Sequence, residues 1–183
     1  MLTRKILYDI FIKNIELGGK MVRFVSSIDE LSFSKLMTVY NETNGLTAKN
    51  DYQDIPDNER IFQVESDFYA YLKECFFVTD GASYVILEEN NIYLSVARVE
   101  PFLDGIILEA LETDPHFRGR GYAKELVGYI VEHVNCPVYS HVSLDNVFSQ
   151  KVHIANGFKI ISNYADYING TRSYKAVTFK YER

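Results

Sequence analysis

The segment from Thr113 to Ala123 has the composition of a phosphate-binding turn between a strand and a helix. Gly119 and Gly121 let the backbone come close to an anion and present successive N–H groups in one direction. The positive end of the following helix adds to these donors, and Arg118 and Arg120 add cationic groups suited to phosphate. The chemistry that this segment predicts is the binding of a pyrophosphate or a similar anion.

Two better-known phosphate loops do not match the segment. It lacks the Gly-Lys-Ser/Thr of a P-loop, and it lacks the Gly-x-Gly-x-x-Gly of a dinucleotide fold with an acidic strand end downstream. Taken alone, the segment therefore also has a plain interpretation, a surface turn between a strand and a helix.

The turn must be positioned by the elements on either side of it. Ile106 to Thr113 is predicted as a strand that ends at Asp114-Pro115, and Gly121 to Val134 carries the apolar stripe of an amphipathic helix. Val138 to Val142 is predicted as the next strand, parallel to the first after a right-handed crossover.

The rest of the chain predicts a mixed, mostly antiparallel sheet and an α+β class. Asn90-Asn91 and Asn169-Gly170 are turn signals between strands. A capping box at Ser27 to Glu30 predicts a helix that ends before Asn44-Gly45. The other expected segments are strands at 21–25, 84–88, 92–100, 158–167 and 173–181, helices at 61–75 and 146–155, and a loop at 47–58. Along 92–100, alternation is expected to place Ile92, Leu94, Val96 and Arg98 on one side.

Two motifs together resemble a known family. Arg118 to Ala123, with Tyr122 before the alanine, resembles the acyl-CoA pyrophosphate motif of the GNAT superfamily, Arg/Gln-x-x-Gly-x-Gly/Ala. Leu111-x-Thr113-x-Pro115 is similar to the end of that family's fourth strand. Downstream, the residues that match a second family pattern at its spacing are Asn146, Ser149, His153 and Gly157-Phe158.

The resemblance covers about residues 21–181 and implies a GNAT-like fold with a mixed sheet and about four helices. It implies an N-acetyltransferase that transfers an acetyl group from acetyl-CoA, or another acyl-CoA, to a primary amine through a tetrahedral intermediate. The acyl-pantetheine arm would lie between the two splayed parallel strands like an added strand. The residues that the resemblance assigns to the cofactor are Leu111, Thr113, Arg118, Gly119, Arg120, Gly121, Tyr122, Ala123, Asn146 and Ser149.

Three residues are candidates for catalysis by this resemblance. The N–H of Leu111 would stabilise the thioester oxygen as negative charge develops on it. Glu109 is the candidate base, because period-two alternation places it on the side of Leu111 and Thr113, with Glu112 opposite. A solvated strand carboxylate is the alternative interpretation of Glu109.

His153 has two open interpretations. The family often has Tyr at this position, where it protonates the leaving thiolate, and a His near its usual pKa can also donate a proton. His153 is otherwise a helix residue that only packs. Lys151 is better explained as a solvated side chain than as a phosphate ligand.

Composition excludes several classes of partner. The net charge is −6 with no basic block, which argues against nucleic acid. No apolar run is long enough to span a membrane, and His116, His133 and His141 have no metal spacing. Cys75 and Cys136 are expected to be buried free thiols, which fits the cytoplasm.

The acceptor is expected to be an amine of a small molecule or a peptide. Acidic and aromatic residues in the 47–58 loop and the C-terminal hairpin would suit a cation, although a solvated loop is the preferred interpretation. A non-catalytic acyl-CoA sensor of the same fold, and a phosphate-binding regulator, are the alternatives in other classes. The resemblance also permits a homodimer.

The first twenty residues have two interpretations. Gly18-Gly19-Lys20-Met21 can be back-translated into a bacterial ribosome-binding site ahead of a start codon. Residues 1–20 are therefore either a translated leader or an N-terminal extension, ahead of a single domain at 21–183 in a bacterial protein.

Overall fold

The computed structural model describes residues 15–182. Eight strands form one mixed sheet in the order β1-β2-β3-β4-β5-β6-β10-β7, and β8 pairs with β9 in a small second sheet. The strands are β1 (Ile15–Leu17), β2 (Lys20–Val25), β3 (Ser83–Glu89), β4 (Ile92–Phe102), β5 (Gly105–Thr113), β6 (Val138–Ser143), β7 (Lys159–Ser162), β8 (Ala165–Asp166), β9 (Arg172–Ser173) and β10 (Ala176–Tyr181). The α-helices are α2 (Phe33–Val39), α3 (Asn41–Asp51), α4 (Asp57–Tyr71), α5 (Tyr122–His133) and α6 (Val147–Ala155).

The antiparallel meander of β3, β4 and β5 forms as the sequence predicts. Asn90 and Asn91 join β3 to β4 with φ of 49° and 66°, a left-handed conformation that Asn tolerates better than most residues. Gly170, at φ 82°, serves the hairpin between β8 and β9. The sequence therefore fixes these connections locally.

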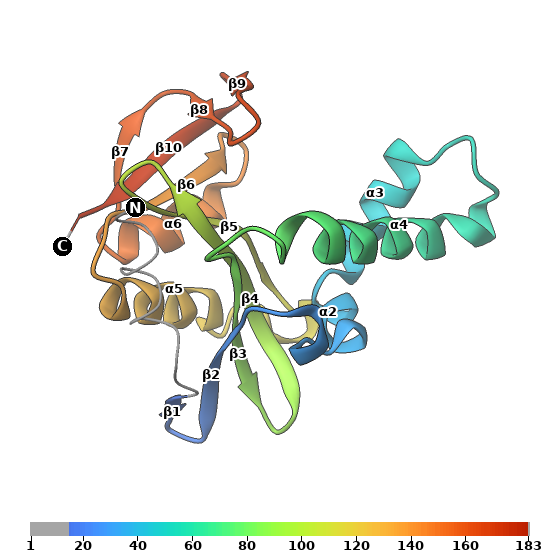
Figure 1. Cartoon of the computed structure of the whole chain (residues 1–183), viewed down its shortest axis with the longest axis horizontal. Coiled ribbons are helices and arrows are strands. Elements are labelled where there is room, and N and C mark those ends of the chain that lie inside the picture. Colours follow the sequence, from blue (N-terminus) through green and yellow to red (C-terminus); the bar gives the residue numbers. More distant parts are fainter. Residues whose placement is uncertain (1–14, 183) are drawn as a thin grey trace.

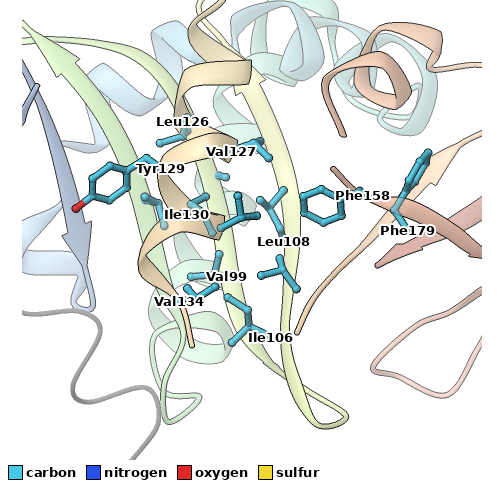
Figure 2. Packing of buried hydrophobic residues seen from close by; sticks show 14 of the residues in the cluster. Val99, Ile106, Leu108, Leu126, Val127, Tyr129, Ile130, Val134, Phe158 and Phe179 are labelled. Atoms are coloured by element: carbon cyan, nitrogen blue, oxygen red, sulfur yellow. The ribbon is translucent and has the colours of Figure 1, made fainter. Parts of the chain in front are cut away.

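Helix α5 covers one face of the sheet. Its apolar stripe packs on Ile106 and Leu108 of β5 and on Val99 of β4, all of which are fully buried (Figure 2). Phe158 and Phe179 close the same core beside β5. This core holds the first turn of α5 in a fixed place relative to the end of β5.

The opposite face is covered in part by α2, α4 and the π-helical turn Leu72–Phe76 that continues α4. Figure 1 shows α3 and α4 extending away from the sheet as an arm, with their connecting loop at its far end. The 47–58 region and the β8–β9 hairpin lie in separate parts of the molecule in this view, so the acidic residues of the two segments do not form one rim.

Strands β5 and β6 are parallel, as predicted, but pair only at Ile106–Val138 and Ile107–Tyr139. Their approach at this end is close, because a Cβ on Gly105 would lie 2.0 Å from the carbonyl oxygen of Pro137. From Leu108 onward β5 has no ladder partner in β6 among the described residues. The two strands therefore part and leave an opening between them, as expected from the resemblance.

The helical region differs from the sequence prediction. Asn44-Gly45 does not end a helix, since α3 runs through it to Asp51, and five α-helices rather than about four occur among residues 15–182. A left-handed cap needs a positive φ, and Gly45 does not adopt one. Asn44 is instead buried and donates to the Met37 sulfur at 3.4 Å, so tertiary packing outweighs the local stop signal.

The predicted alternation along β4 is also wrong in part. Leu94 packs in the core beneath α5, whereas Val96 packs on the opposite face with α2. The register between β3 and β4 shifts between Leu87 and Glu88, and this irregularity inserts an extra residue on the β4 side. An insertion of one residue reverses the faces that follow it.

The possible leader is described only in part. Residues 1–14 lie outside the described residues. Ile15 to Leu17 pair with β2 through a turn at Gly18 and Gly19, and the Lys20 ammonium lies 2.5 Å from Glu125 of α5. Whether translation begins at Met21 stays a prediction.

Candidate functional site

The turn between β5 and α5 leaves an open set of backbone donors. Asp114 accepts a hydrogen bond from the His116 N–H at 2.9 Å and starts a 3-10 turn at Pro115–Phe117. Gly121 is the N-cap of α5, and no side chain caps the helix there. The first N–H groups of a helix have no partner within it, so the start of α5 can bind an anion.

A cavity of about 670 Å³ lies at this helix start, between the end of β5 and helix α6. Of the ten residues that the sequence assigns to the cofactor, all but Arg120 line it. The lining residues that the sequence analysis did not assign to the cofactor are Glu112, Lys124, Phe148, Lys151 and Val152. Two of these, Lys124 and Lys151, add positive charge to the cavity lining.

Gly119 and Gly121 adopt φ of 76° and 86°, where a side chain would be strained. A Cβ built on either glycine meets no protein atom within 4 Å, so it would project into free space. Since Gly121 and Gly119 both line the cavity, an anion can approach their backbone closely. The residues present therefore fit a pyrophosphate group.

The two arginines of the turn have different surroundings. The Arg118 guanidinium contacts Glu42 of α3, lies 3.8 Å from Glu112 and donates to the Thr113 carbonyl at 3.3 Å. The Arg120 guanidinium lies over the Phe117 ring, 5.3 Å from its centroid, and Arg120 is not one of the residues that line the cavity. Arg118 is thus the arginine placed to reach a phosphate in the cavity.

Strand β5 contains a bulge at Ala110. Arg98 pairs with Glu109 and Val96 with Glu112, so two residues of β5 face Ala97 alone. Ala110 has a φ of 49°, and its carbonyl accepts a hydrogen bond from the buried Tyr40 hydroxyl at 2.8 Å. The bulge is therefore held in place from the α2 side of the sheet.

The bulge decides which backbone groups face the opening. The Ile106 N–H donates to Pro137 on the β6 side, whereas the Asp114 N–H donates to Leu94 on the β4 side. Because backbone groups alternate along a strand, the N–H groups of Leu111 and Thr113 point away from β4, toward the opening. Without the extra residue they would point to β4 instead.

The same bulge contradicts the predicted face of Glu109. Leu111 packs against the α5 core, whereas Glu109 and Glu112 both lie on the other face, opposite Arg98 and Val96. Strict period-two alternation had placed Glu109 with Leu111, and that prediction fails because Ala110 shifts the period by one residue. Glu112 accepts from the Thr43 hydroxyl at 2.9 Å, and burial raises its pKa.

His153 lies in the core rather than in the cavity lining. It is 1% exposed, stacks on Phe179 and meets Phe158 edge to face. Its Nδ1 lies 2.8 Å from the Ser149 carbonyl, an acceptor, so Nδ1 carries the proton, and its buried Nε2 has no partner among the described residues. Burial lowers the pKa of His153 despite that hydrogen bond. This arrangement favours the packing interpretation over proton donation.

Asn146 has a structural role at the start of α6. Its side-chain oxygen accepts from the Ser149 N–H at 3.0 Å and caps the helix. Both residues line the cavity, so the cap places the first turn of α6 opposite the start of α5.

The other histidines and the two cysteines have surroundings typical of structural or surface residues. His116 is exposed beside Asp114, and His133 stacks on Tyr129 at 3.9 Å. Cys136 is buried as predicted, but Cys75 is exposed. Among residues 15–182 no group of three or more metal-ligating side chains comes together, and no helix there is long and apolar enough to cross a membrane.

The sequence analysis missed three residues on the face of β4 and β5 opposite α5. These are Arg98 and Glu100 of β4 and Tyr71 of α4, which lie near Glu109. The charges of Arg98 and Glu109 influence the pKa values of Glu100 and Tyr71. The only sequence signal was a charged pair two residues apart in an otherwise apolar strand. Their convergence with Tyr71 depends on how α4 packs and has no local signature.

Comparisons with known proteins agree with this geometry. The model of the Acetyltransferase (GNAT) family matches residues 49–158. A curated relative, the [ribosomal protein bS18]-alanine N-acetyltransferase of Haemophilus ducreyi, is 28% identical over 128 residues, 63% of this chain and 88% of that protein.

Two solved structures have a similar fold. A GNAT-family acetyltransferase from Bacillus cereus has a TM-score of 0.57 at 23% identity, over 91% of this chain and 99% of its own. The PaiA N-acetyltransferase of Thermoplasma acidophilum in complex with coenzyme A has a TM-score of 0.58 at 14% identity, over 88% and 99%. These two structures share the fold, and the family match, which covers more than half of the chain, shows that the chain belongs to the GNAT acetyltransferase family.

Proposed function

We propose that the protein transfers an acetyl group from acetyl-CoA to a primary amine, with a peptide N-terminus as the first candidate acceptor. The observation that carries this proposal is the cavity at the uncapped start of α5, adjoining the opening between β5 and β6. The acceptor class follows from the curated relative, which is a ribosomal protein alanine N-acetyltransferase. We place the reaction in a reducing compartment such as the cytoplasm, which fits the free thiols of Cys75 and Cys136.

The cofactor would supply an activated acyl group as a thioester. Backbone N–H groups of Gly119, Gly121 and the first turn of α5 would bind its pyrophosphate, with Arg118 beside them. The N–H of Leu111 would donate to the acyl oxygen where negative charge develops. Glu109 stays our candidate for the carboxylate that receives the acceptor's proton, directly or through water.

A non-catalytic acyl-CoA sensor is the second candidate, and one observation favours it. His153 stands where the family often has a proton-donating Tyr, yet its ring is buried and packs on Phe179. A sensor would bind acetyl-CoA with the same cavity and release no thiol in the presence of amines.

Calorimetry with acetyl-CoA tests the cofactor site. We expect micromolar binding that Arg118→Ala weakens by about ten- to a hundredfold, since a charge-assisted hydrogen bond contributes about 1.5–3 kcal/mol. Arg120→Ala should weaken binding less, because Arg120 lies outside the cavity lining. Arg60→Ala, on α4 and paired with Asp57, is the neutral control.

Absence of binding of acetyl-CoA and of longer acyl-CoAs to folded protein would remove the proposal. Binding that ATP competes for equally well would favour a general phosphate-binding regulator. Binding of acetyl-CoA without thiol release, across a panel of amines and peptides, would favour the sensor.

A further inference from the structure

Three charged side chains lie next to one another on the face of β4 and β5 opposite α5. Arg98 pairs directly with Glu109 across the two strands, and Glu100 pairs with Ile107. Glu100 therefore lies diagonal to Glu109 on the same face, within the reach of cross-strand neighbours. All three side chains are half-buried.

Arg98 is committed to one of the two carboxylates. Its guanidinium lies 3.8 Å from the Glu109 carboxylate and stacks over the rings of Tyr71 and Phe76 at 5.2 and 5.5 Å. Its Nε is buried without a hydrogen-bond partner among the described residues, so the aromatic rings and Glu109 fix its place. The positive charge of Arg98 is thus paired with the Glu109 carboxylate.

Glu100 lacks such a partner. No ion pair or hydrogen bond of its carboxylate occurs within residues 15–182. Burial, and then the charge of Glu109, raise the pKa of Glu100, and Arg98 opposes them. A half-buried carboxylate in these surroundings is stabilised when it binds a proton or lies beside a cation. The pair and Arg98 together carry one uncompensated negative charge when both carboxylates are ionised.

The Glu109 end of this charged group borders the opening between β5 and β6. Glu109 lies two residues before Leu111, whose N–H points into the opening between β5 and β6. Glu100 and Glu109 lie on the sheet face opposite the α5 core, and Glu100 is level with Ile107, the last residue of β5 that pairs with β6. Tyr71 of α4 borders the carboxylates on the latter side.

We propose that Glu100 is a second catalytic carboxylate, which holds the acceptor's ammonium together with Glu109 and takes its proton in place of Glu109, while Arg98 positions Glu109. This inference rests on the proposed N-acetyltransferase function. The ammonium loses one proton to Glu100, and the nitrogen lone pair forms the C–N bond. The C–S bond breaks with its electron pair on sulfur, which gains the second proton lost by nitrogen. Glu100 then returns its proton to solvent.

A titration of the carboxylates tests the pair without any turnover. The protein is labelled with ¹³C at the Glu side-chain carboxyls, and Glu100→Gln and Glu109→Gln assign the two signals. We expect Glu100 to titrate at a higher pH than the exposed glutamates, and Glu109→Gln to lower that midpoint. Saturating L-alaninamide, the probe for an α-ammonium, should lower it too and shift both signals.

Glu100 titrating with the exposed glutamates, unmoved by Glu109→Gln and by L-alaninamide, would overturn the proposal. A midpoint that responds to Glu109→Gln but not to the probe would assign a structural pair and would equally overturn the catalytic role. These readouts do not depend on whether an acceptor has been found.

Turnover then separates this inference from the proposed function. With L-alaninamide or an alanine-leading peptide, Glu100→Gln should lower kcat about a hundredfold, the usual contribution of general base catalysis. It should leave acetyl-CoA binding unchanged, and its activity should rise with pH as the free amine forms. Arg98→Met should shift the pH profile while the protein stays folded by circular dichroism.

The matched control is Glu89→Gln, a half-buried glutamate at the far end of β3, which should keep wild-type turnover. Normal turnover by Glu100→Gln would overturn the inference and leave the N-acetyltransferase proposal intact. If the wild-type protein binds no acetyl-CoA and acetylates no amine, the proposed function fails, and the titration alone decides whether Glu100 and Glu109 form an ammonium site.

Discussion

At the scale of single residues, the environment of a side chain decides its chemistry more than its type does. His153 has a protonatable ring at a position that the family uses for proton transfer, but its surroundings are Phe158, Phe179 and the Ser149 carbonyl. Glu100 has no distinguishing pattern in the sequence, yet its half-buried carboxylate has no ion pair within residues 15–182, and burial raises its pKa. Burial thus makes His153 a poor proton donor, and it favours a protonated Glu100.

The buried His153 predicts a pH-dependent stability. Its folded-state pKa lies below the ordinary value of 6.5, so the unfolded chain binds the proton first as the pH falls. The stability that neutral His153 provides is therefore full above this value and is lost as the pH falls through the folded-state pKa. His153→Phe should reduce this loss, measured by urea unfolding at about pH 7.5 and about pH 5.5.

His116→Phe is the control for that measurement, because His116 is exposed. An unchanged pH dependence in His153→Phe would contradict the assignment of His153 to the core.

At the scale of elements, one bulge in β5 organises the site. It places the N–H of Leu111 toward the opening, puts Glu109 and Glu112 on the same face, and leaves the Ala110 carbonyl to the Tyr40 hydroxyl. Bulges often re-aim side chains next to active sites. Here the hydroxyl belongs to Tyr40, the residue between α2 and α3, so the packing of these helices on the sheet helps to hold the bulge in its shape.

Tyr40→Phe should weaken both stability and catalysis. The Ala110 carbonyl would lose its buried donor, which costs about 1–3 kcal/mol of unfolding free energy. A loosened bulge should lower kcat, because the N–H of Leu111 would no longer be held in place. Acetyl-CoA binding should change little, because the pyrophosphate site lies beyond the bulge, at Gly119, Gly121 and the first turn of α5. Urea unfolding and thiol release measure the two effects.

Tyr52→Phe is the control. The Tyr52 hydroxyl donates a hydrogen bond to the exposed Asp67 carboxylate at 2.8 Å and lies outside the site. If Tyr40→Phe matched this control in stability and in kcat, the Tyr40 hydroxyl would have no part in holding the bulge.

At the scale of the whole molecule, the arm formed by α3 and α4 is joined to the cofactor turn. Glu42 and Thr43, in the first turn of α3, contact Arg118 and Glu112 of the cavity lining. The arm itself extends away from the sheet (Figure 1). Binding of a phosphate and contact with α3 therefore compete for the Arg118 guanidinium.

Glu42→Gln should tighten acetyl-CoA binding by up to about fivefold, because an exposed ion pair worth about 0.2–1 kcal/mol is removed. Arg118 would then be free to turn toward the cavity. Calorimetry at low and high salt measures the change, which should shrink as salt screens the pair.

Glu59→Gln, an exposed glutamate at the start of α4 in the same arm, should bind acetyl-CoA as the wild type does. Weaker binding in Glu42→Gln would mean that Glu42 holds Arg118 in its binding position and does not compete for it.

The sequence by itself determined the family, the phosphate turn and the order of the main elements. Gly119, Gly121, the apolar stripe of α5 and the Asn90-Asn91 turn act through local conformation, and local conformation is written in residue type and spacing. The turn and the bounds of the two flanking elements could therefore be predicted to within a residue, and nine of the ten predicted cofactor residues line one cavity.

Only the tertiary structure decided the faces and partners of the catalytic candidates. The bulge at Ala110 has no local signal, because a non-glycine residue adopts its positive φ only when the surrounding structure holds it there. The continuation of α3 through Gly45, the burial of His153 and the grouping of Arg98, Glu100 and Glu109 arise in the same way. Each depends on contacts between residues distant in sequence, which spacing along the chain does not encode.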